Sequence, residues 1–274
     1  MRLILHSPLP KSYTDLVGRG LFRFLLTAQG LAAFALITLG VMLKKFRVAQ
    51  PVIRPLIRRE IYRTGVQLLP MFLFMSAAIG FLVIGQTVVV LQKTLGSFNY
   101  LGTVMVVVVV RELGPLLAAV LVLARVGTAN VIELGMARAV GEVEALEALG
   151  IDPVHYLVVP RVIGLVLSTF ALTVYLILGA LVTGYLWAFL QNVPLQPGEY
   201  FKQLALALSG IDFILLLLKT CAFGFTIAIV TCYHGLAQPL RLEDVSRATV
   251  QAVAQGIIAF VVVDALFILV YLFA

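Results

Sequence analysis

The residues most able to do chemistry in this chain are charged side chains inside long apolar runs. Arg111 and Glu112 are adjacent and follow the run 104–110, Lys219 lies within ILLLLKTCAF, and Asp264 lies within VVVDALF. Inserting a charged side chain near the bilayer centre costs at least about 2.5–3.5 kcal/mol of free energy. Each of these charges is therefore expected to have an interaction partner or a function. Such charges could pair between helices and lock a bundle, line a polar patch in a substrate cavity, or form a path for protons or ions.

Arg111 and Glu112 stand at a predicted kink. As neighbours they point about 100° apart on a helix, so they do not face each other across a turn. Pro115 has no N–H group and therefore releases the carbonyl of Arg111 from the helical hydrogen-bond ladder. A kinked helix with two charges at membrane depth is typical of a cavity wall or of a contact with a polar partner.

Lys219, Arg125 and Asp264 are the other charges within apolar sequence. Lys219 could extend to the nearest interface, or it could face the cavity and pair with Glu112 or with an anionic head group. We interpret Arg125 and Asp264 as structural intramembrane charges. For Asp264 we expect an arginine or a small polar group of a neighbouring helix as the partner.

Motifs for catalysis and metal binding are absent from the sequence. It has no P-loop, no H-E-x-x-H motif and no Cys/His cluster, and His6, His155 and His234 lie far apart. We therefore predict that the chain is not an enzyme, binds no metal and carries no cofactor of its own.

Composition determines the class of protein that must position these charges. The chain has 274 residues, of which 62% are hydrophobic and only 12% charged, against about 25% charged in a soluble domain. This predicts an all-α, polytopic membrane protein. The net charge of +7 does not indicate nucleic-acid binding, because the basic residues gather in one short stretch.

Five apolar runs are long enough to span a bilayer: 66–92, 102–131, 162–190, 211–233 and 248–274.

The basic stretch 44–65 predicts the orientation of these spans, because short loops rich in Lys and Arg stay cytoplasmic. Loops 133–161 and 235–248 are then also cytoplasmic, whereas loops 93–102 and 191–210 and the C-terminus are external. A crossing by the apolar run 24–43 would place Lys11, Arg19 and Arg23 outside. For this run we therefore expect an interfacial or elbow helix, with a sixth span as the alternative.

Two regions follow from this reading. Residues 1–65 form an amphipathic, membrane-associated N-terminal region, and residues 66–274 form the transmembrane domain.

A further element is expected in the cytoplasmic loop, as a coupling helix at about 136–150. Its sequence ARAVGEVEALEAL has apolar residues at approximate i, i+3 spacing beside acidic ones: Val143, Leu146, Leu149, Glu142, Glu144 and Glu147. An amphipathic helix can dock into a groove of a partner, and its acids disfavour the anionic membrane surface. Gly150 ends this helix, and Asp152-Pro153 follow.

The motifs RELGPLLAAVLVLARVG, ELGMARA and EALEALGIDPVHYLVVPRV together resemble the MlaE-type permeases of MCE-linked ABC lipid transporters. LLKTCAF, VSRATVQAV and VVVDALF agree with this, and the resemblance extends from about residue 61 to the C-terminus. It implies a homodimeric permease in the bacterial inner membrane, with two cytoplasmic ABC ATPases that bind ATP and Mg, a periplasmic ring of MCE-domain subunits, and a phospholipid cavity at the dimer interface. Such a system would move phospholipids between the inner and outer membranes and maintain outer-membrane lipid asymmetry.

The resemblance also assigns residues. It places Arg111, Glu112 and Lys219, with Leu113, at the polar part of the lipid cavity. It makes the loop 137–153 the ATPase-coupling element, with contacts from Glu142, Glu144, Leu146, Glu147, Leu149 and Asp152. The chain departs from the family at Val140-Gly141-Glu142, where Thr-Glu-Gln is common. A glycine inside this helix is expected to cost about 1 kcal/mol relative to alanine.

Three other functions compete with this interpretation. A proton- or ion-coupled secondary transporter would use Glu112 and Asp264, but it is expected to contain inverted repeats, which the sequence lacks. A membrane-embedded enzyme would need a nucleophile or a metal cluster. A structural anchor for a periplasmic complex would not explain the intramembrane charges.

Overall fold

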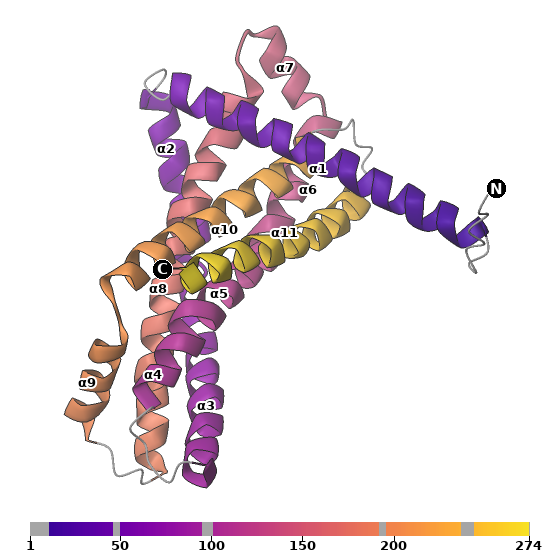
Figure 1. The fold of residues 1–274 in the computed structure, drawn as a ribbon. Coiled ribbons are helices and arrows are strands. Elements are labelled where there is room, and N and C mark those ends of the chain that lie inside the picture. Colours follow the sequence, from indigo (N-terminus) through magenta and orange to yellow (C-terminus); the bar gives the residue numbers. More distant parts are fainter. Residues whose placement is uncertain (1–10, 46–49, 95–100, 192–195, 237–243, 274) are drawn as a thin grey trace, which may run out of the picture.

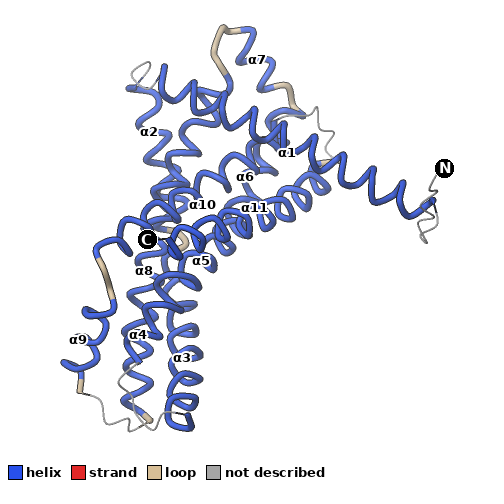
Figure 2. Tube along the Cα trace, viewed as in Figure 1, coloured by secondary structure: helices blue, strands red, loops and turns tan. Residues whose placement is uncertain are grey.

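The computed structural model describes residues 11–45, 50–94, 101–191, 196–236 and 244–273, and every regular element in these ranges is helical (Figures 1 and 2). Six stretches are long and apolar enough to cross a membrane: Leu26–Lys44, Pro51–Val88, Leu101–Ala139, Val154–Leu190, Gly210–Leu236 and Val245–Tyr271. The predicted all-α, polytopic fold is therefore confirmed. The parts of the expected loops at 95–100, 192–195 and 237–243 lie outside the described residues.

Several spans consist of consecutive helical segments. One such span comprises α2 (Gln50–Ile61), the π-helical η1 (Tyr62–Val66) and α3 (Leu69–Thr94). The expected boundary between residues 65 and 66 falls inside η1. The next span comprises α4 (Leu101–Met105), the π-helical η2 (Val106–Leu113), α5 (Gly114–Val122), the π-helical η3 (Leu123–Gly127) and α6 (Thr128–Ala139). Short π-helical insertions often occur at functional sites, and η2 contains Arg111 and Glu112.

The second half of the chain begins with α7 (Glu142–Ala148) and the π-helical η4 (Val154–Val158). It continues with α8 (Val159–Leu190), α9 (Pro197–Ala207), α10 (Gly210–Leu236) and α11 (Val245–Phe273). Helices α3 and α8 run alongside each other, and α10 and α11 cross them obliquely (Figure 1).

Small residues allow α3 and α8 to approach closely. A Cβ atom at Gly80 would lie 2.4 Å from the Ala180 carbonyl oxygen, and one at Gly179 would lie 2.3 Å from Ser76 Oγ. Helices in a membrane associate through such close packing because lipid offers no hydrophobic driving force between them.

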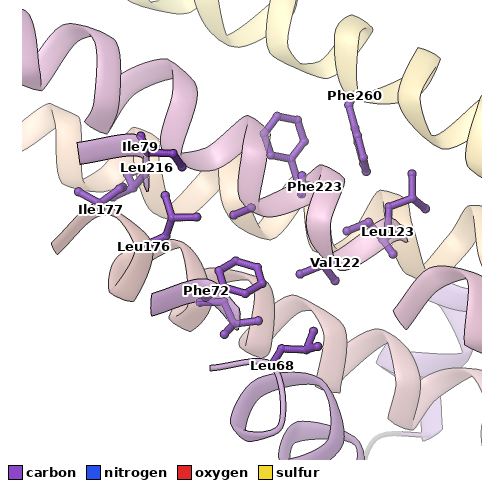
Figure 3. Close-up of a cluster of buried hydrophobic side chains, with 14 of the residues drawn as sticks. Leu68, Phe72, Ile79, Val122, Leu123, Leu176, Ile177, Leu216, Phe223 and Phe260 are labelled. Carbon is purple, nitrogen blue, oxygen red and sulfur yellow. The ribbon is translucent and has the colours of Figure 1, made fainter. Parts of the chain in front are cut away.

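A buried apolar cluster fills the junction of the spans (Figure 3). Phe72 of α3 is fully buried there. Phe223 of α10 and Phe260 of α11 meet edge to face, with ring centroids 5.4 Å apart. Aromatic pairs prefer this geometry.

The sequence did not predict α9, which lies in the expected external loop 191–210. Pro197 is its first residue, a favoured position for proline. The Tyr200 hydroxyl donates to the Leu181 carbonyl at 3.2 Å. Burial raises the pKa of this phenol well above its usual range, so it stays protonated and able to donate. Gln203 Oε1 accepts a hydrogen bond from the Gly102 N–H at 3.1 Å, which fastens α9 to α4.

Helix α1 (Lys11–Lys45) runs across one end of the bundle at a steep angle to α3 and α8 (Figure 1). Its mid-part contacts the last turn of α10: the Phe34 and Tyr233 rings meet edge to face at 5.9 Å. A Cβ atom at Gly30 would lie 2.5 Å from the Tyr233 hydroxyl. The middle of α1 therefore lies at an end of the bundle, as expected for an elbow helix, although α1 is long enough to cross a membrane.

Candidate functional site

Pro115 explains why the backbone carbonyl of Arg111, in the π-helical segment η2, is available to a side chain. Proline cannot donate the usual i→i−4 hydrogen bond to the Arg111 carbonyl. That carbonyl accepts a hydrogen bond from Lys219 Nζ at 3.0 Å. The backbone group released by the proline, as the sequence predicted, thus joins the side-chain chemistry of the site.

Five charged residues form one cluster, called the charge cluster below: Arg111, Glu112, Asp212, Lys219 and Asp264. Lys219 lies at its centre, and its side chain is 0% exposed. Its ammonium donates to Glu112 Oε2 at 2.9 Å and to the Arg111 carbonyl, and it forms an ion pair with Asp264 Oδ1 at 2.7 Å. The ammonium thus has two hydrogen-bond acceptors and one ion-pair partner. Lys219 therefore does not extend to an interface, and its pairing with Glu112, one of the sequence-based alternatives, is present.

The partner of Asp264 differs from the one expected. The sequence suggested an arginine or a small polar group, but the carboxylate of this α11 residue, 15% exposed, pairs with Lys219 of α10. The physical reason is that α10 packs against both η2 and α11. A lysine in the middle of α10 can therefore reach carboxylates on either side.

Asp212 belongs to the same cluster of charges, and the sequence reasoning missed it. Its side chain is 2% exposed and lies in the first turn of α10. Arg111 Nε lies 2.9 Å from Asp212 Oδ1, and Arg111 Nη2 donates to Oδ2 at 3.2 Å. Oδ2 also accepts from the Ser209 N–H at 2.9 Å. An acidic residue at the start of an apolar span was the available signal, because it too needs a partner in the membrane.

Arg111 has a further neighbour at the end of α11. Its guanidinium carbon lies 5.4 Å from the centroid of the Tyr271 ring, within the range of a cation–π contact. Together with Asp212, this ring holds the guanidinium between α10 and α11.

The cluster has a buried part and an accessible part. Lys219, Asp212 and Asp264 lie inside it, whereas Arg111 is 31% and Glu112 35% exposed. Leu113, the other residue expected at the cavity, is half-buried beside them. The structure thus brings Arg111, Glu112 and Lys219 together and leaves two of them accessible.

Arg125 does not belong to this cluster. It lies on η3 with an exposed side chain. The ion pairs among the described residues do not include it, and its structural pairing stays a prediction.

A second ion network lies toward the end of the bundle near α7. Glu133 of α6 accepts from Arg63 Nη1 of η1 at 2.8 Å and from Arg161 Nη2 of α8 at 3.1 Å. Glu60 of α2 is buried in the same region, and a Cβ atom at Gly164 of α8 would lie 2.7 Å from Glu60 Cγ. These contacts tie α2 and η1 to α6 and α8, next to the loop expected to couple to a partner.

The expected single coupling helix at about 136–150 is divided into two. Helix α6 ends at Ala139, and α7 begins at Glu142. Gly141 stands between them with φ +84°, and a Cβ atom there would meet nothing within 4 Å. The prediction that Gly141 weakens a continuous helix was therefore wrong, because glycine adopts this left-handed conformation readily.

The C-terminal end of α7 follows the predicted stop. The Gly150 N–H donates to the Glu147 carbonyl and the Ile151 N–H to the Leu146 carbonyl, both at 2.9 Å. With Gly150 at φ +75°, this is a Schellman motif. Asp152 Oδ1 then accepts from the Val154 N–H at 3.0 Å and so caps the following helix.

The surface of α7 is acidic and partly apolar. The side chains of Glu142, Glu144 and Glu147 are exposed, as is Leu149, whereas Leu146 is half-buried. Val143, the first residue of the predicted stripe, is buried against the bundle. One apolar side chain thus anchors the helix to the bundle, and its acidic side chains remain exposed.

Comparison with known proteins identifies the class of molecule to which these features belong. Residues 57–270 match the family described as Permease MlaE. The chain belongs to the MlaE permease family. It is therefore an ABC transporter permease, a subunit that is not itself catalytic and works with an ATPase.

Named relatives of this MlaE-family chain come from several lineages. It is 31% identical to a probable ABC transporter permease protein of Rickettsia prowazekii over 255 residues, which covers 90% of this chain and 93% of the relative. It is 34% identical to another from Synechocystis over 169 residues, 60% of this chain and 62% of the relative. The chloroplastic protein TRIGALACTOSYLDIACYLGLYCEROL 1 of Arabidopsis thaliana is 26% identical over 211 residues, which covers 75% of this chain and 58% of the relative.

The described residues contain no group of three or more His, Cys, Asp or Glu side chains that could hold a metal ion. The acidic residues of the charge cluster are instead paired with Lys219 and Arg111.

Proposed function

We propose that this permease moves phospholipids between the inner and outer membranes of a bacterium and so supports outer-membrane lipid asymmetry. It would act in the inner membrane as a homodimer, with a cytoplasmic ABC ATPase on α7 and a periplasmic MCE-domain ring on the opposite side. ATP and Mg would bind to the ATPase, not to this chain.

The observation that carries the proposal is the accessible Arg111–Glu112 pair within an apolar surface. One turn before Arg111, Val107 is exposed, and one turn after Asp264, Ile268 is exposed. Such a site suits an amphiphile, with acyl chains against the apolar side chains and a polar head group at the charges. A small ion or a soluble substrate would gain nothing from the surrounding apolar surface.

The name of the Arabidopsis relative refers to a galactolipid. This supports a lipid substrate for the present chain.

The acidic helix α7 supports the proposed docking of the ATPase. It stands out at one end of the bundle, between two left-handed glycines, and is anchored through Val143 (Figure 1). A force applied to α7 would reach α6 directly and α8 through η4. ATP binding to the partner could then shift the spans between two arrangements of different lipid affinity.

A secondary transporter that uses Glu112 and Asp264 is the alternative. Both carboxylates are ion-paired with the same lysine, so their charges are already compensated within the bundle. Membership in an ABC permease family also supports an ATP-driven subunit.

The proposal is tested with the complex that co-purifies with this chain, reconstituted between donor and acceptor vesicles that contain fluorescent phospholipid. We expect ATP-dependent transfer, slowed at least about tenfold by Glu112→Ala, which corresponds to about 1.4 kcal/mol. Glu199→Ala, which removes an exposed carboxylate on α9, serves as the matched control and should keep the rate. Transfer at the full rate by Glu112→Ala would refute the assignment of the cavity.

A further inference from the structure

The accessible end of the charge cluster has unused hydrogen-bonding groups of both signs. Arg111 directs Nε and Nη2 to Asp212, and its contacts with described residues leave Nη1 without a partner. Glu112 directs Oε2 to Lys219, and Oε1 likewise has no partner within the described ranges. One guanidinium nitrogen and one carboxylate oxygen, on adjacent residues, are thus available to a ligand.

The charges behind this pair decide which ligand fits. Arg111 and Lys219 supply two positive charges, and Glu112, Asp212 and Asp264 supply three negative ones, so the cluster carries one net negative charge. The ammonium of Lys219 is fully buried and already has three partners. It therefore cannot be the group that attracts an anionic head group.

A purely anionic head group meets this site unfavourably. Its phosphate could approach Arg111, but Asp212 already balances that guanidinium with two close oxygens, and Glu112 would repel the ligand. A head group with a phosphate and an ammonium is complementary instead. The phosphate can accept from Arg111 Nη1, and the ammonium can donate to Glu112 Oε1 through a charge-assisted hydrogen bond.

We propose that the Arg111–Glu112 pair selects zwitterionic phospholipids with a primary ammonium, such as phosphatidylethanolamine, over anionic ones. This inference rests on the proposed function, because it names the head group that the proposed lipid cavity prefers. Asp212 acts as a positioning residue that fixes the guanidinium and neutralises it, and Glu112 is the residue that contacts the ammonium.

The experiment compares head groups in the reconstituted complex. Phosphatidylethanolamine and phosphatidylglycerol with identical labelled acyl chains are supplied separately, and the initial rates of ATP-dependent transfer are measured. We expect the wild-type protein to favour phosphatidylethanolamine by about tenfold, the effect of one charge-assisted hydrogen bond. Glu112→Gln should bring the ratio of the two rates close to one.

Asp264→Asn is the matched control. It changes the net charge of the cluster by the same amount as Glu112→Gln, but at the far side of Lys219. It should keep the ratio of the two rates, even where the overall rate falls. If Asp264→Asn loses the preference as fully as Glu112→Gln, the cluster acts through its net charge, and the proposed contact is overturned.

A second measurement needs no variant. Lipids that co-purify with the wild-type complex, quantified by mass spectrometry against the surrounding membrane, should be enriched in phosphatidylethanolamine. Equal transfer of both lipids without enrichment would overturn this inference and leave lipid transport intact. ATP-dependent transfer of neither lipid would instead overturn the proposed function, and the inference with it.

Discussion

Replacing Lys219 separates the stabilising role of the charge cluster from its role in transport. Lys219→Met removes a fully buried cation and leaves the Asp264 carboxylate, only 15% exposed, without its ion-pair partner. Removing one member of a buried pair typically costs about 3–5 kcal/mol, because the remaining charge is uncompensated. Glu112 is 35% exposed and can still reach solvent or a head group. Most of the cost should therefore come from Asp264.

The double variant Lys219→Met, Asp264→Leu tests this assignment. Replacing a whole buried pair by apolar residues is often neutral or stabilising. We expect its free energy of unfolding, measured by denaturant titration in mixed micelles, to return to within about 1 kcal/mol of the wild-type value. Asp264→Leu alone should cost less than Lys219→Met alone, because Lys219 keeps Glu112 and the Arg111 carbonyl as partners.

Two results would contradict this reasoning. A loss of less than about 1 kcal/mol in Lys219→Met would show that the buried pair does not stabilise the bundle. A double variant that is stable and transports lipid at the wild-type rate would show that the pair only holds helices together. We expect instead a stable double variant with impaired transport, because Glu112 loses the ammonium that orients it.

Two further predictions concern packing and coupling. Gly80→Ala should lower the free energy of unfolding by about 1–3 kcal/mol, because its Cβ atom would lie 2.4 Å from a backbone oxygen of α8. Gly40→Ala, where a Cβ atom meets nothing within 4 Å, should be neutral or slightly stabilising, and equal melting temperatures for both variants would contradict the packing argument. Charge reversal at Glu142 and Glu144 together should release the ATPase, whereas reversal at Glu199 of α9 should not. Normal co-purification and ATP turnover after the double reversal would show that docking does not depend on these acids.

The local features of this protein follow from its sequence. Apolar runs of sufficient length predict membrane helices, because burial in lipid requires backbone groups to be satisfied within each segment. The release of the Arg111 carbonyl follows from Pro115, and the end of α7 follows from Gly150. These are effects of neighbouring residues, so the sequence alone could determine them. The motifs around Arg111 also sufficed to suggest the family.

The partners of the charges depended on the tertiary structure. Asp212 and Arg111 are separated by 101 residues, and Lys219 and Asp264 lie on different spans. Only the packing of α10 between η2 and α11 brings these side chains within hydrogen-bond distance. The conformation of Gly141 also could not be predicted from the sequence. The residue pattern around α7 does not reveal whether a glycine lies inside one helix or between two helices.

The sequence by itself thus determined that charges lie within the membrane, whereas the tertiary structure decided which of them are neutralised inside the bundle and which remain accessible. The physical reason is that the cost of a buried charge depends on partners that only folding brings into contact.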